Sequence, residues 1–138
     1  MPRPVEEVNR FFADIANLER ITPPELRFRI LSPLPEEMRE GVRIEFRLSL
    51  FGLPFGWHTE ITRWEPPCRF VDRQLAGPYR QWIHLHEFTA ERDGTRMRDA
   101  VDYVLPLGPL GLLGLPLVRR ELDRIFDYRE DAIRRLLG

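Results

Sequence analysis

The sequence predicts an α+β domain in which one curved antiparallel β-sheet wraps around a long C-terminal α-helix. Three observations support this class. The chain opens with apolar residues at helical spacing, its middle alternates apolar and polar residues, and residues 115–138 return to helical spacing. The long amphipathic helix can cover one face of the sheet. A sheet that curls around such a helix can enclose more space than side chains fill, which would leave an internal cavity.

Length and charge restrict the class of protein further. A chain of 138 residues has the size of one ordinary domain, and we expect a single domain over residues 1–138. The net charge of −1 and the dispersed basic residues argue against a nucleic-acid partner. No apolar run reaches the roughly 18 residues that a membrane span needs, and we expect no stable membrane insertion. No apolar segment of a signal peptide follows the first basic residue, so we expect a cytoplasmic location.

Two compositional features allow two explanations. The 21 basic residues are all arginine, there are 13 prolines, and the only side-chain amides are Asn9, Asn17, Gln74 and Gln81. Few thermolabile amides and many prolines are typical of a heat-adapted protein. A GC-rich genome, which favours arginine codons over lysine codons, accounts for the arginines equally well. The single cysteine, Cys68, has no partner for an internal disulfide.

The first element predicted is a helix over residues 4–20. Its apolar residues recur at helical spacing, and Pro4 suits a first helical turn. A break near Asn17 would divide it into two short helices. The segment Thr22-Pro23-Pro24 ends it, because a residue before proline avoids the helical region.

The middle of the chain predicts five or six antiparallel strands joined by short turns. The alternating segments are residues 26–30, 42–50, 55–64, 68–75, 79–91 and 95–105. Proline and glycine lie between most of them, and Asp93-Gly94 is a strong hairpin signal. We therefore expect a continuous meander.

The end of the chain predicts a loop followed by the long helix. Residues 106–114 (PLGPLGLLG) form an apolar loop that we expect to cover the entrance of a cavity. The apolar stripe of the helix comprises Val118, Leu122, Ile125, Phe126, Ile133 and Leu136.

The segment QWIHLHEF, residues 81–88, places two histidines on one face of a strand. Residues two apart in a strand point to the same side, so His84 and His86 share a face with Trp82 and Phe88. The Asp93-Gly94 turn would place Arg92 opposite Thr95. The same face would then carry Met97, Asp99, Val101, Tyr103 and Leu105 from the partner strand. Phe46, Trp57 and Phe70 would join from other strands, as would Asp72 and Gln74 if their strand has the same phase.

This face resembles the wall of a small-molecule pocket, which is apolar with a few convergent polar groups. The simpler alternative is that both histidines are hydrogen-bonded core residues. A metal site is disfavoured because two histidines need a third ligand, for which Asp99 is a better candidate than the outward-facing His58. We expect neither metal nor cofactor. A histidine beside a carboxylate can also act as general acid or base, and His84 or His86 could pair with Asp99 or Asp72 in this role. No nucleophile elbow, phosphate loop or dinucleotide motif accompanies them.

Three stretches resemble one superfamily. PVEEVNRFFADIANLERITPP, WHTEITRWEPPCRFVDRQLAGPYRQWIHLHEF and DYVLPLGPLG are similar to SRPBCC proteins, which include START lipid-transfer domains, polyketide cyclases and plant pollen allergens. The resemblance implies a helix-grip fold with a deep hydrophobic cavity, and ligands such as lipids, sterols or polyketides. One departure is that family members usually have a strand before the first helix. Its absence here would leave an open sheet edge, through which a homodimer could form.

The hypothesis is therefore a carrier or sensor of a hydrophobic small molecule held between the sheet and the C-terminal helix. The expected ligand-binding residues are Trp57, Phe70, Trp82, His84, His86, Phe88, Asp99, Tyr103, Ile125 and Phe126. The first alternative is a cyclase or dehydratase that uses a histidine–aspartate pair. The second is an interaction module whose cavity is filled by its own side chains.

Overall fold

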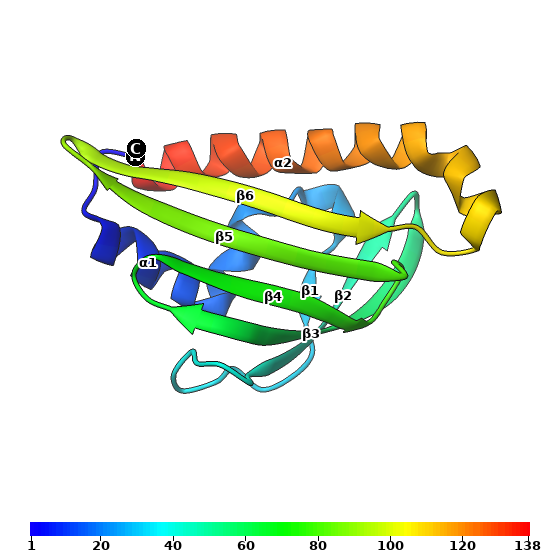
Figure 1. Cartoon of the computed structure of the whole chain (residues 1–138), viewed down its shortest axis with the longest axis horizontal. Helices are drawn as coiled ribbons and strands as arrows, with labels where there is room; N and C mark the ends of the chain where they lie inside the picture. Colours follow the sequence, from blue (N-terminus) through cyan, green and yellow to red (C-terminus); the bar gives the residue numbers. More distant parts are fainter.

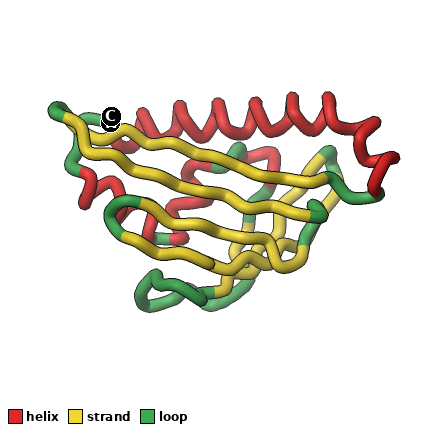
Figure 2. The backbone as a smooth tube through the Cα atoms, viewed as in Figure 1, coloured by secondary structure: helices red, strands yellow, loops and turns green.

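A six-stranded antiparallel sheet and one long helix dominate the structure, a computed structural model that describes residues 1–138 (Figure 1). The strands follow each other in sheet order β1-β2-β3-β4-β5-β6, so the predicted meander is confirmed. Their bounds are β1 Arg29–Ile30, β2 Arg43–Leu50, β3 Leu53–Glu65, β4 Arg69–Ala76, β5 Gln81–Glu91 and β6 Gly94–Val104. The helix α2, Leu115–Leu137, runs alongside β5 and β6 (Figure 2). The predicted α+β helix-grip class is confirmed.

The N-terminal helix ends earlier than predicted. The α-helix α1 spans Val5–Ala13, and a 3₁₀ helix, η1, follows over Ile15–Ile21. The break lies at Asp14 rather than near Asn17, because the Asp14 carboxylate accepts a hydrogen bond from the backbone N–H of Ala16 at 3.1 Å. Such an N-cap satisfies a backbone donor at the start of the second helix.

The strand predicted over residues 26–30 is mostly absent. Pro24–Leu26 forms a 3₁₀ turn, η2, and only Arg29–Ile30 pairs with β2. Arg27 has a φ of 50°, in the left-handed region. That conformation ends the turn and interrupts the extended backbone, which the alternation of residue types could not reveal.

The register of the β5–β6 hairpin differs from the prediction by two residues. Glu91 pairs with Gly94, so the turn residues are Arg92 and Asp93 rather than Asp93 and Gly94. The positive φ falls on Gly94, at 154°, while the two turn residues have negative φ. A type I′ turn centred on Asp93 and Gly94 needs positive φ at both residues, and Asp93 does not have it, so the hairpin is present but its predicted register is wrong.

The consequence is a new set of opposite pairs on an unchanged face. Phe88 lies opposite Met97, not Asp99, and His86 lies opposite Asp99, not Val101. A slip of two residues preserves the side to which each side chain points, whereas a slip of one would have reversed it. In the same way His84 pairs with Val101, not Tyr103, and Trp82 pairs with Tyr103, not Leu105.

The buried side chains form two apolar clusters between the sheet and the helices. The first contains Val8, Phe12, Ile15, Ile21, Met38, Ile44, Ile61, Phe70, Phe88, Ala132, Ile133 and Leu137. The second contains Leu26, Leu48, Leu50, Trp57 and Trp82. Both draw on the inward face of the sheet, which fits the alternation seen in the sequence. No helix in this structure has the length and apolar character to cross a membrane.

Candidate functional site

A cavity of about 180 Å³ lies between the sheet and the helices, and its apolar lining draws on both clusters. Aromatic side chains make up much of the wall. Apart from Trp57 and Tyr79, its polar lining is limited to Thr22, Thr59, Asp72, His84, His86 and Arg129. An apolar chamber with few polar groups is the usual form of a small-molecule site.

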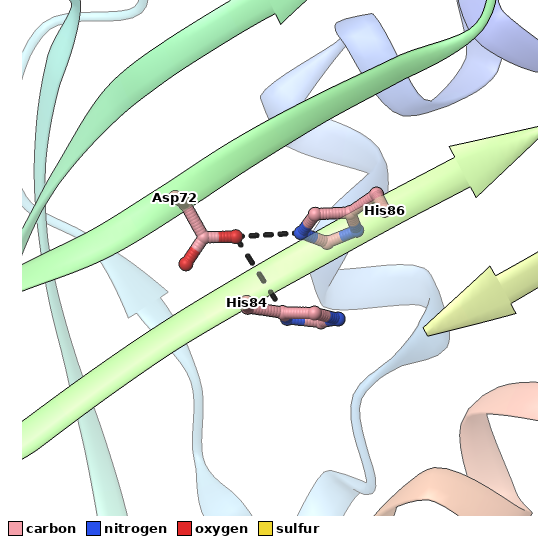
Figure 3. Close-up of side chains that lie close together, drawn as sticks. All are labelled: Asp72, His84 and His86. Atoms are coloured by element: carbon pink, nitrogen blue, oxygen red, sulfur yellow. Dashed lines mark hydrogen bonds and ion pairs between the residues drawn. The ribbon is translucent and has the colours of Figure 1, made fainter. Parts of the chain in front are cut away.

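Three of these polar residues come from two adjacent strands. Asp72 on β4 lies opposite His84 on β5, and the next inward pair along the strands is Phe70 with His86. Because residues two apart point to the same face, the carboxylate and both imidazoles converge on the inside of the sheet (Figure 3). The two imidazole rings stack with their centroids 3.7 Å apart.

The hydrogen bonds of His86 define its tautomer. Its Nε2 lies 2.6 Å from Asp72 Oδ2, and Arg129 Nη2 lies 3.3 Å from its Nδ1. A guanidinium can only donate, so Nδ1 accepts and the ring proton lies on Nε2, from which it is donated to Asp72. His86 is therefore a neutral imidazole held at both nitrogens.

Burial, the nearby His84 and, to a smaller extent, Arg129 together lower the pKa of His86 to about 4, although the hydrogen bond to Asp72 opposes them. Its neighbour His84 is placed between two carboxylates. Its Nε2 lies 2.8 Å from Asp99 Oδ1, and its Nδ1 lies 3.8 Å from Asp72 Oδ2.

Both carboxyl groups stay ionised despite their burial. Burial alone would raise the pKa of Asp99, but the Arg129 guanidinium, the His84 hydrogen bond and the nearby imidazoles hold it well below its usual range. Burial would also raise the pKa of Asp72, but the hydrogen bond from His86 and the neighbouring positive groups lower it. A nearby cation generally lowers the pKa of a carboxyl group, because it stabilises the ionised form.

Arg129 is the member of this cluster that sequence reasoning missed. It is buried, and its Nε lies 3.3 Å from Asp99 Oδ2. A signal for it exists in the sequence, because position 129 lies on the apolar stripe of α2, three residues after Phe126 and four before Ile133. A charged residue within an apolar stripe indicates a buried ionic partner.

Seven predicted site residues line the cavity: Trp57, Phe70, Trp82, His84, His86, Ile125 and Phe126. The other three do not. Phe88 packs in the first apolar cluster, with its ring centroid 5.3 Å from that of Phe12. Asp99 and Tyr103 line a separate cleft of about 700 Å³ between β6 and α2. This follows from the position of β6 at the edge of the sheet beside α2, where inward side chains meet the gap between strand and helix.

Asp72 and Gln74, whose phase the sequence left open, differ in their placement. Asp72 lines the cavity, whereas Gln74 donates through Nε2 to the backbone carbonyl of Tyr79 at 2.6 Å. Gln74 thereby holds the β4–β5 turn. His58 is exposed on the outer side of β3, as its phase predicts.

The same cluster offers three atoms to a metal ion. One ligand atom each from Asp72, His84 and His86 lies within 4.8 Å of the others. A metal would have to displace the Nε2 proton of His86 and would face the positive charge of Arg129. Asp72 and His86 are already hydrogen-bonded to each other, and the set fits a metal poorly.

Comparison with known proteins places this arrangement in a class. A family model described as "Polyketide cyclase / dehydrase and lipid transport" matches residues 1–127, and the chain belongs to this family. No curated protein matches the chain. The family and fold support hydrophobic ligand binding in general.

Solved structures share the fold at low sequence identity. Protein Ms6760 from Mycobacterium smegmatis aligns with a TM-score of 0.69 and 20% identity, over 99% of this chain and 85% of that one. The protein TTHA0849 from Thermus thermophilus gives 0.67 and 21%, over 100% and 94%. Ara h 8.0201 gives 0.60 and 16%, over 96% and 91%.

Proposed function

We propose that the protein binds a compact, ring-containing hydrophobic molecule, aromatic or polyketide-like, and carries or senses it. The observation that supports this most is the apolar cavity with its polar cluster on one wall. The apolar lining favours transfer of a ligand from water, and the polar groups orient it.

The size of the cavity favours a small ligand within the proposed class. An apolar cavity of roughly 150 Å³ holds a single benzene ring. The cavity here measures about 180 Å³, which suits one or two rings. A sterol or a long-chain lipid would require α2 to move away from the sheet.

Two buried donors that lack an aligned hydrogen bond indicate the polar groups that the ligand should carry. Trp57 Nε1 and Arg129 Nε are buried without an aligned hydrogen-bond partner, and both residues line the cavity. A buried donor without a partner costs roughly 1–3 kcal/mol. A ligand with hydroxyl or carbonyl oxygens would supply acceptors to these donors.

Filling the cavity is expected to abolish binding. Ligands released from the denatured protein by organic solvent would be identified by mass spectrometry, and their affinity measured by calorimetry. Ile125→Trp, on the cavity side of α2, should reduce affinity by at least about tenfold, since the indole occupies the ligand's space. Asp127→Trp adds the same side chain on the exposed side of α2 and should bind normally. Equal affinity of the two variants would refute this site.

A second candidate is an enzyme that moves a proton on a polyketide-like substrate. The pairing of each histidine with an aspartate, at 2.8 Å for His84–Asp99 and 2.6 Å for His86–Asp72, supports it. Such pairs typically contribute a 10²–10⁴-fold rate effect in general acid–base catalysis.

The two candidates differ in the effect of His84→Asn. An enzyme should lose turnover by roughly 10²-fold or more while substrate affinity changes little. A carrier should show no turnover in either form, and only a change in affinity. Product formation followed by chromatography, with the ligand class found by extraction, decides between them.

A further inference from the structure

One end of the molecule exposes a group of leucines that the cavity does not use. They are Leu107, Leu110, Leu112, Leu113 and Leu117, and their exposed fractions lie between 58% and 81%. They belong to the 3₁₀ helix η3, Gly108–Gly114, and its junctions with β6 and α2. We call these five residues the leucine tip. Residues 103–118 contain no charged side chain.

A second apolar turn lies at the same end of the molecule. Phe51, in the β2–β3 turn, and Leu53, the first residue of β3, are also exposed. Figure 1 shows this turn and η3 toward the same end of the long axis, the end at which α2 begins. Exposed apolar residues scattered singly are ordinary, but a concentrated group indicates an interaction surface.

The charged residues nearest to the leucine tip in the sequence are basic. Arg119 and Arg120 follow it directly on α2, and Arg80 lies beside the end of β6, where its backbone N–H bonds to the carbonyl of Val104 at 2.9 Å. All three are exposed. The acidic residues nearby are Asp102 and Asp123, which are exposed, and Glu121, which is paired with Arg124.

We propose that the leucine tip docks the protein on the surface of an anionic lipid bilayer. The leucines would enter the boundary between head groups and acyl chains, and the arginines would contact lipid phosphates and anionic head groups. In the sequence, Arg119 and Arg120 directly follow the leucines, so one surface can make both the apolar and the basic contacts. A symmetric contact between two copies fits less well, because it would gather the arginines of both copies around one interface.

Two residues that line the cavity are also close in the sequence to the exposed apolar residues at this end. Leu122, five residues after Leu117, lines the cavity, as does Leu50, the residue before Phe51. A docked molecule would therefore have residues of the cavity wall within about two helical turns of its membrane contact. Docking does not depend on the ligand proposed above, and it can be tested without it.

The test is flotation of the full chain with vesicles of phosphatidylcholine alone or mixed with phosphatidylserine. The wild-type protein should float with the mixed vesicles and less with the neutral ones. The double variant Leu110→Ser/Leu113→Ser should lose binding by about tenfold or more, since two apolar contacts are removed. The double variant Arg119→Glu/Arg120→Glu should lose the preference for anionic vesicles.

The matched control is Leu31→Ser/Leu34→Ser, which removes two exposed leucines outside the tip and should float like the wild type. The four leucines replaced in the tip variant and in the control are all exposed, so circular dichroism and thermal unfolding should show that both variants are folded. Wild-type protein that fails to float, or tip variants that float normally, would overturn the proposal. The proposal would also be overturned if light scattering showed a dimer that the tip variant converts to a monomer, while neither protein bound vesicles. The leucines would then form an interface between two copies.

Discussion

Replacing Arg129 with methionine is expected to lower the free energy of unfolding by about 3–5 kcal/mol. Methionine keeps much of the apolar contact of the arginine stem but removes its charge. Asp99 would then be buried without its cation, and Nδ1 of His86 would lose its donor at 3.3 Å. The cost arises mainly from the carboxylate left behind, not from the ion pair itself.

Urea unfolding followed by tryptophan fluorescence measures this loss. The control is Arg134→Met, which removes an arginine from the exposed side of the same helix and should change stability by less than about 1 kcal/mol. The double variant Arg129→Met/Asp99→Asn should regain part of the loss, because the buried charge is also removed. Similar stabilities for the Arg129 and Arg134 variants would contradict the role of Arg129 as the counter-charge of the cluster.

Stability is expected to fall by about 3 kcal/mol as the pH decreases from about 6.5 to about 4, because of His86 alone. Its pKa in the folded protein is about 4, whereas an unfolded histidine titrates near 6.5. Between these values the unfolded chain binds a proton that the folded protein does not, so lower pH favours unfolding. Above about pH 6.5 both states are neutral at this residue and the effect is absent.

The aspartates act in a lower window. Asp72 and Asp99 have lowered pKa values in the folded protein, so their contribution is complete above about pH 4 and is lost as the pH falls further. Urea midpoints across the pH range separate the two windows. His86→Gln, which keeps a donor for Asp72, should flatten the upper window, and His58→Gln, at an exposed position, should leave it intact. An unchanged slope in His86→Gln would show that another group titrates there.

Asp72, His84, His86 and Arg129 form a polar cluster on one wall of the apolar cavity. In the ligand-binding hypothesis such a cluster has a specific use. It keeps fixed donors and acceptors in place without water, so a ligand with matching oxygens is bound in one orientation. The cost in stability at low pH is then a consequence of holding a neutral histidine and two carboxylates inside the fold.

The sequence by itself determined the order of helices and strands, the α+β class and the family, because these depend on local periodicity. It also determined that His84 and His86 share the inner face with Trp82, since alternation along a strand survives a register error of two residues. The same local logic failed at Arg27, whose left-handed backbone ends a turn within an alternating segment.

Only the tertiary structure decided which groups meet across elements. Arg129 reaches His86 and Asp99 from α2, and that contact depends on how the helix lies on the sheet, not on any spacing along the chain. That Asp99 and Tyr103 line the cleft between β6 and α2 depends on the position of β6 at the sheet edge. The cavity volume depends on sheet curvature and side-chain packing, which are properties of the whole fold because every buried side chain contributes to them.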